Sequence, residues 1–154
     1  MLGGRLEVGA DLPGFPCTGP VPAGILRAMS SESRGYPSVF VCDDSAAERF
    51  LLGQRIQAQR DLLLAGAAST ALGGVQAIEA TQPDVVILDH LDHDGDVSVI
   101  VGAIKDAVQG VKVVVHSALP ANRIVGMASA DAYVHKSSEP DSLWQAIRQV
   151  FAAD

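Results

Sequence analysis

From Pro37 onward, short apolar runs of strand length alternate with longer stretches in which apolar residues recur at helical spacing. The first kind of segment is typical of a buried β-strand and the second of an amphipathic helix. The pattern predicts strands over Ser38–Cys42, Asp61–Ala68, Val85–Asp89, Val111–Ser117 and Asp131–Lys136. It predicts helices over Ser45–Ala58, with Ser45 as the N-cap, and over Leu72–Ala80, Val97–Val108, Ala121–Ala130 and Ser138–Ala153.

Strands that are apolar on both faces and alternate with helices indicate an α/β fold, in which a parallel sheet is covered by helices on both sides. Right-handed crossovers between such units favour a doubly wound, five-stranded sheet of order 2-1-3-4-5, the flavodoxin-like topology. The ligand site of such a sheet lies beyond the carboxyl ends of its strands, near the point where the strand order reverses. The residues that follow the strands are therefore the candidates for chemistry.

Polar side chains stand at the carboxyl ends of four of these strands: Asp43-Asp44, Asp89, Ser117 and Lys136. Three carboxylates in one pocket repel one another unless a hard divalent cation such as Mg²⁺ or Mn²⁺ neutralises them. The lysine and the serine can each donate to an oxygen of a phosphoryl group. A carboxylate nucleophile, a metal and such donors are what an aspartyl-phosphate site requires.

In these residues the chain resembles the receiver domains of two-component response regulators. Receivers carry an acidic pair, a phospho-acceptor, a switch Ser/Thr with a small neighbour, a switch aromatic and a lysine, where this chain has Asp43-Asp44, Asp89, Ser117-Ala118, Tyr133 and Lys136. The match covers about Pro37 to Phe151. The stretches Val111–Ala118 and Lys136–Ser138 are most similar to receivers that are usually fused to a helix-turn-helix output domain.

The resemblance implies a signalling protein and not an enzyme. Asp89 would accept a phosphoryl group from a histidine kinase or phosphotransfer protein, and Lys136 would bind that group. Ser117 would then move toward the phosphate and Tyr133 would turn inward, which changes the surface offered to a downstream protein target. A homodimer formed on phosphorylation is a further expectation.

The resemblance also implies a Mg²⁺ site. Asp44, Asp89 and the backbone carbonyl of Leu91 would coordinate the ion, and Asp43 would act mainly through a bound water. Leu91 also argues against phosphatases that form an aspartyl-phosphate, because they carry a second Asp two residues after the nucleophile.

Three positions depart from the receiver pattern. His93 and Ser137 stand where receivers usually have prolines, and without the second proline a cis peptide after Lys136 is not expected, since a non-proline cis bond costs about 3 kcal/mol. Ser129 replaces a glycine near the end of the fourth helix, which predicts a short or mobile helix there. These departures keep open two alternatives: a receiver-fold interaction module that no longer cycles phosphate, and a fragment of a DNA-binding regulator.

Four histidines near the same end of the sheet raise the alternative of a transition-metal site: His90, His93, His116 and His135. Strand alternation predicts that His116 and His135 point away from the sides used by Ser117 and Lys136. Packing or solvated histidines are therefore favoured over a zinc site.

Composition narrows the classes of function. The net charge of −7 gives a surface that repels phosphate backbones, so direct nucleic-acid binding is not expected. No apolar run approaches the ~20 residues needed to cross a bilayer. The two cysteines, Cys17 and Cys42, lack the spacing of a metal site or a disulfide framework, which favours a reducing cytoplasm.

The first 36 residues differ from the remainder. They hold four prolines among many glycines and show no sustained period, which predicts a flexible N-terminal extension before a single receiver domain over residues 37–154. A basic segment followed by a long apolar one is missing, so a secretory signal is a poor fit. Met29 is a hypothetical true start.

Overall fold

The structure is a computed structural model that describes residues 35–89 and 96–153. Residues 1–34, 90–95 and 154 lie outside the described part. The flexible extension over residues 1–36, the domain boundary after it and the start at Met29 therefore stay predictions. Within the described ranges, no helix has both the length and the apolar character that a membrane crossing requires.

The described residues build one parallel sheet of five strands in the order β2-β1-β3-β4-β5. This confirms the predicted doubly wound α/β fold. The strands agree with the predicted ones to within two residues at each end: β1 (Ser38–Cys42), β2 (Leu63–Ala68), β3 (Val85–Asp89), β4 (Lys112–Ser117) and β5 (Ala132–His135). Because β1 lies between β2 and β3, the strand order reverses beside β1, where the ligand site of such a fold is expected.

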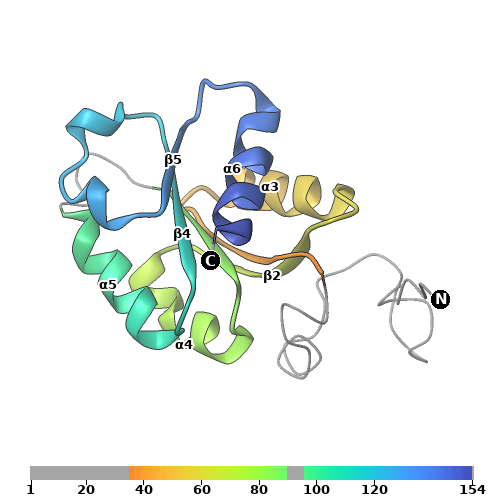
Figure 1. The fold of residues 1–154 in the computed structure, drawn as a ribbon, viewed down its shortest axis with the longest axis horizontal. Helices are drawn as coiled ribbons and strands as arrows, with labels where there is room; N and C mark the ends of the chain where they lie inside the picture. The colour runs from red at the N-terminus through yellow and green to blue at the C-terminus, as the bar shows by residue number, and fades with distance from the viewer. Residues whose placement is uncertain (1–34, 90–95, 154) are drawn as a thin grey trace.

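Two helices cover each face of the sheet (Figure 1). On one face lie α3 (Ala46–Ala58) and α6 (Pro140–Ala152), and on the other lie α4 (Ala71–Thr81) and α5 (Val97–Ala107). Neighbouring strand residues supply opposite cores: Val39 packs with α3 and α6, and Phe40 packs with α4 and α5. Both are almost wholly buried, so the strands need apolar side chains at every position.

Side-chain caps fix the helix starts at the carboxyl edge of the sheet. Ser45 Oγ accepts the Glu48 N–H at 3.3 Å, which confirms Ser45 as the N-cap of α3. Thr70 caps α4 and Asp96 caps α5 in the same way. Each cap satisfies a backbone donor that has no partner within the helix. The loops that end in these caps therefore hold their positions around the strand ends.

The predicted helix over Ala121–Ala130 is wrong. Two short 3-10 turns replace it, η2 (Ala121–Arg123) and η3 (Met127–Ser129). Ile124, between them, is extended and buried in the core, and the next carbonyl, of Val125, accepts the Val97 N–H at 2.9 Å. Gly126 then adopts φ +79°. A hydrogen bond to the start of α5 and a buried isoleucine thus replace the helix.

Gly126 provides a test of how the segment between η2 and η3 packs against the start of α5. An added Cβ would meet Asp96 Oδ1 at 2.0 Å and the Ser98 nitrogen at 2.7 Å, and the backbone already has φ +79°. We expect Gly126→Ala to lower the free energy of unfolding by roughly 2–4 kcal/mol, measured by urea denaturation.

Gly102→Ala is the matched control, because Gly102 lies within α5 and nothing lies within 4 Å of its added Cβ. This substitution should stabilise the protein by about 0.5–1 kcal/mol, the helix preference of alanine over glycine. Equal stabilities of the two variants would contradict the packing described for η2 and η3.

Candidate functional site

The strand register gathers the candidate residues at one edge of the sheet. Asp43 follows β1, whose last residue pairs with Leu88 of β3, so Asp43 lies beside Asp89. Asp89 pairs with His116 of β4. The next residue, Ser117, ends β4, and its carbonyl accepts the Lys136 N–H at 2.9 Å. Four strands thus bring the two carboxylates, the serine and the lysine to the same end of the sheet.

The Lys136 ammonium lies among three carboxylates. Its Nζ is 3.1 Å from Asp89 Oδ1, 3.5 Å from Asp43 Oδ2 and 2.5 Å from Glu48 Oε2. The Asp43 and Asp89 side chains are only 1% and 4% exposed, whereas that of Glu48 is 49% exposed. Two buried negative charges thus depend on one lysine, and an exposed third competes with them for it.

The pKa values reflect this crowding. Burial raises the pKa of Asp43 to about 6, and the nearby Glu48 and Asp89 carboxylates act in the same direction. Burial also raises the pKa of Asp89, although Lys136 acts in the opposite direction. Burial alone would lower the pKa of Lys136, but its contacts with Glu48 and Asp89 raise it above the usual lysine value. The site therefore holds ionised carboxylates at a cost that a further cation would relieve.

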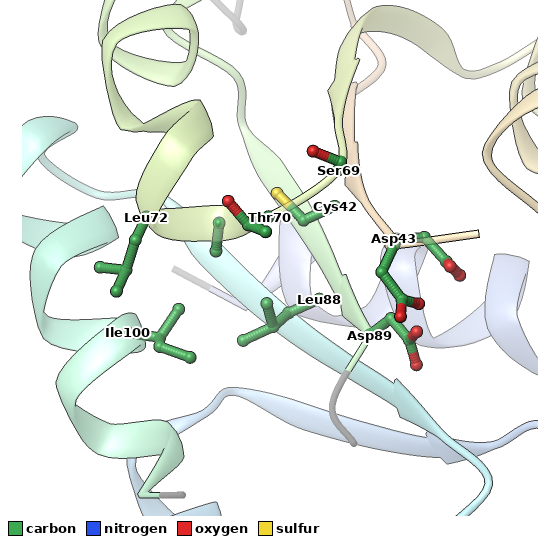
Figure 2. A pocket seen from close by; sticks show the side chains of 10 residues that line it. Cys42, Asp43, Ser69, Thr70, Leu72, Leu88, Asp89 and Ile100 are labelled. Atoms are coloured by element: carbon green, nitrogen blue, oxygen red, sulfur yellow. The ribbon is translucent and has the colours of Figure 1, made fainter. Parts of the chain in front are cut away.

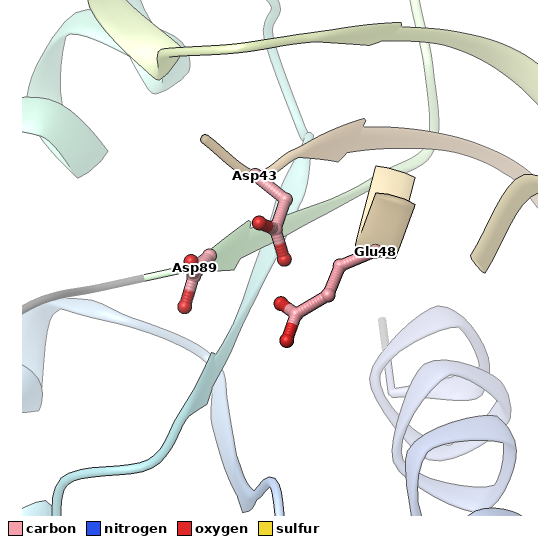
Figure 3. A group of neighbouring side chains, drawn as sticks. All are labelled: Asp43, Glu48 and Asp89. Carbon is pink, nitrogen blue, oxygen red and sulfur yellow. The ribbon is translucent and has the colours of Figure 1, made fainter. Parts of the chain in front are cut away.

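The carboxylates of Asp43, Glu48 and Asp89 point toward one another (Figure 3). One oxygen from each lies within 4.8 Å of the others, which makes them the group in the described part of the chain that could hold a metal ion. Three anionic oxygens so arranged fit a hard divalent cation. No histidine belongs to this group among the described residues, and His90 and His93 lie outside them.

The sequence prediction of metal ligands differs from this group. Asp44 is exposed, and its backbone carbonyl accepts from Arg49 Nη1 at 3.3 Å. Leu91 lies outside the described residues. Sequence reasoning missed Glu48, although Ser45 and Glu48 form the S-x-x-E pattern of a capped helix start, which would have placed Glu48 in the first turn beside the strand end.

A cleft of about 350 Å³ leads to the carboxylates (Figure 2). Asp43 and Asp89 lie at one end of it, Leu72 and Ile100 lie at the other, apolar end, and Leu88 lies between them. Asp44 also lines the cleft. The Asp89 region is thus reached past the starts of α4 and α5.

The thiol of Cys42 forms part of the wall of this cleft. Burial raises the pKa of Cys42 to about 12, so the thiol is protonated at neutral pH and is not the nucleophile of the site.

The two predicted switch residues meet at the loop that follows β4. Ser117 is fully buried, and its Oγ accepts the Leu119 N–H at 3.1 Å. The half-buried Tyr133 donates its hydroxyl hydrogen to the Leu119 carbonyl. His135 Nε2 donates to the Ala118 carbonyl at 2.9 Å. This loop is therefore tied to β5, the strand that ends next to Lys136.

The peptide between Lys136 and Ser137 is trans, since no cis bond occurs in residues 35–89 and 96–153. This agrees with the expectation from the missing proline.

His116 lies on the face of the sheet opposite to Ser117, as strand alternation predicted. That face is shared by His116 and Lys136. The two side chains line the same small cavity beside α3 and α6. His116 pairs with Val134, so Lys136, two residues further along, lies on the same face. Burial lowers the pKa of His116 to about 4, helped by Lys136, so the imidazole is neutral at pH 7.

Known proteins resemble this chain over part of its length. No family model matches it. A protein named protein-glutamate methylesterase/protein-glutamine glutaminase from Maricaulis maris is 30% identical over 112 residues, which cover 69% of this chain and 28% of that protein. The protein of the same name from Nitrobacter hamburgensis is 41% identical over 62 residues, which cover 40% of this chain and 16% of that protein. The matched residues thus span less than a third of these relatives.

Several solved structures match this chain over nearly their full length. The response regulator domain of Thermotoga maritima CheB has a TM-score of 0.65 at 24% identity, covering 77% of this chain and 98% of that one. A chain from the complex of CheY6 with the phosphorylated P1 domain of CheA3 from R. sphaeroides has a TM-score of 0.59 at 19% identity, covering 76% and 97%. The described part of this chain therefore has the fold of the response-regulator receiver domains, the family that its motifs resemble.

Proposed function

We propose that this chain is a phospho-accepting receiver domain, which takes a phosphoryl group on Asp89 from a histidine kinase or phosphotransfer protein and signals by protein contact. The observation that carries the proposal is the contact of Lys136 with Asp89, 3.1 Å long, at the edge where the strand order reverses. A buried carboxylate beside a lysine and a second buried carboxylate, Asp43, suits an aspartyl-phosphate site.

Each residue has a role in the transfer. A carboxylate oxygen of Asp89 forms the new bond to phosphorus while the bond from phosphorus to the donor imidazole breaks, and the imidazole keeps the electron pair and takes up a proton. Lys136 binds a phosphoryl oxygen, and the Ser117 hydroxyl donates to another once it leaves the Leu119 N–H. Tyr133 then turns inward, which changes the surface next to β5.

The carboxylate group also supports a Mg²⁺ site. Asp43, Asp44, Asp89 and the carbonyl of Leu91 are the proposed ligands, and Glu48 is close enough to compete with them. Mg²⁺ would supply the positive charge that lets a phosphoryl group approach these carboxylates. The raised pKa values of Asp43 and Asp89 support the proposal, because burial makes their charged forms costly and a bound cation would relieve that cost.

Two observations support the proposed partners. Among the similar structures is a complex of CheY6 with the phosphorylated P1 domain of CheA3, in which a domain of this fold meets a phosphorylated partner. The 350 Å³ cleft beside Asp89 offers a way in for such a donor.

One observation favours the alternative of an interaction module that no longer cycles phosphate. Lys136 lies closer to Glu48 than to Asp89, so the lysine is already occupied. A phosphorylation assay therefore distinguishes a phospho-accepting receiver from such a module.

Incubation with acetyl phosphate and Mg²⁺ should add one phosphoryl group to the wild type, detected by intact mass. Asp89→Asn should abolish the addition, because the amide is not a nucleophile for phosphorus. Asp106→Asn, which removes an exposed carboxylate from α5, is the control and should be phosphorylated like the wild type. A wild type that never gains mass would support the non-cycling module.

The pKa of Asp43 predicts how stability depends on pH. Its folded-state value of about 6 lies above the unfolded value of about 3.9, so its contribution to stability is present below about pH 4 and lost as the pH rises through 6. We therefore expect the free energy of unfolding of Asp43→Asn, relative to that of the wild type without metal, to rise by roughly 2 kcal/mol from about pH 4 to about pH 7.5. Urea denaturation at the two pH values measures the difference.

Saturating Mg²⁺ should remove this gain, because the cation then stabilises the ionised Asp43 of the wild type. Asp106→Asn again serves as the control and should respond to Mg²⁺ as the wild type does. If Mg²⁺ left the stability of both the wild type and the Asp43→Asn variant unchanged, the metal site would be excluded.

A further inference from the structure

Glu48 occupies an unusual place in the first turn of α3. In a capping box the Glu at this position accepts the N–H of the N-cap residue. Here that donor is taken: the Ser45 N–H donates to Asp43 Oδ1 at 2.9 Å. Ser45 Oγ still accepts the Glu48 N–H, so the helix start is capped without the Glu48 carboxylate. The carboxylate is therefore free to make another contact.

That contact is with Lys136. Glu48 Oε2 lies 2.5 Å from the ammonium, nearer than the oxygens of Asp89 at 3.1 Å and Asp43 at 3.5 Å. The hydrogen bond with Lys136 lowers the pKa of Glu48, so the carboxylate is ionised at neutral pH. Glu48 thus contacts the same ammonium that a phosphoryl group on Asp89 would need.

Exposure makes this contact the easiest one to break. The side chain of Glu48 is 49% exposed, against 4% for Asp89 and 1% for Asp43. Glu48 can turn into water without leaving a buried charge unpaired, whereas the two aspartates cannot. Of the three contacts of Lys136, the one with Glu48 therefore costs least to break.

We propose that Glu48 is a positioning residue that holds Lys136 in the unphosphorylated protein and gives it up when a phosphoryl group arrives on Asp89. The proposal rests on the proposed phospho-accepting function. In the unphosphorylated protein, Glu48 provides the anionic partner of Lys136 that the phosphoryl group would later replace. Binding of that group then exchanges one anionic partner of Lys136 for another, so Glu48 sets how readily the phosphorylated arrangement forms.

The test uses beryllofluoride, which mimics a phosphoryl group on an aspartate, at saturating Mg²⁺ on the full chain. Isothermal titration calorimetry gives its affinity, and a separate titration gives the affinity for Mg²⁺ alone. Glu48→Gln should bind beryllofluoride roughly two- to fivefold more tightly than the wild type, the range expected for a half-exposed ion pair. Its affinity for Mg²⁺ should change by less than that.

Glu48→Asp separates the contact from the charge. The aspartate keeps the negative charge and suits the first turn of a helix, but it is one methylene shorter and cannot reach Lys136 as Glu48 does. We expect it to bind beryllofluoride as tightly as Glu48→Gln does. Glu79→Gln, an exposed acid of α4 outside the cluster, is the control and should match the wild type.

Four outcomes would overturn the proposal. An unchanged affinity in Glu48→Gln would show that Glu48 does not compete for the lysine. A Glu48→Asp protein that behaves like the wild type would show an effect of charge alone. A roughly tenfold loss of Mg²⁺ affinity in Glu48→Gln would make Glu48 a metal ligand instead. A wild type that binds Mg²⁺ but no beryllofluoride would remove the proposed function as well, which distinguishes that failure from the other three.

Discussion

The contact between Lys136 and the two buried carboxylates of Asp43 and Asp89 is the interaction on which the site depends. It joins residues from the ends of three strands, β1, β3 and β5, that are far apart in the sequence. Two carboxylates with side chains only 1% and 4% exposed would be costly without this cation. The sheet order makes the contact possible, because β1 and β3 are neighbours and β4 alone separates β3 from β5.

The remaining architecture serves to hold these strand ends in register. Apolar residues on both faces of β1 and β3 lock the sheet between the two helical layers, so the carboxylates cannot shift along their strands without exposing a core residue. The loop after β4 is tied to β5 through Tyr133 and His135. A change at Asp89 that displaced this loop would therefore also displace β5, the edge strand of the sheet.

The sequence predicted the strands and the sheet order because a buried parallel strand leaves a strong apolar signal and right-handed crossovers leave few topologies. It placed Asp43, Asp89, Ser117 and Lys136 at one edge for the same reason. The helix expected over Ala121–Ala130 does not form, because Ile124 is buried and the Val125 carbonyl bonds to the start of α5. Both effects depend on tertiary packing, which the local sequence pattern does not contain. Glu48 was missed because its partner is 88 residues away and the capping pattern suggested a local bond instead.

The balance of charge explains why the site would need a cation besides Lys136 in order to accept a phosphoryl group. Three carboxylates around one ammonium leave an excess of negative charge, which one divalent cation would neutralise. Under the proposed function, a phosphoryl group on Asp89 would add negative charge again, and Lys136, whose ammonium lies 3.1 Å from Asp89, would meet it. Since Glu48 is the most exposed of the partners of Lys136, releasing Glu48 costs least, and the site can change its pairing without unfolding its buried part.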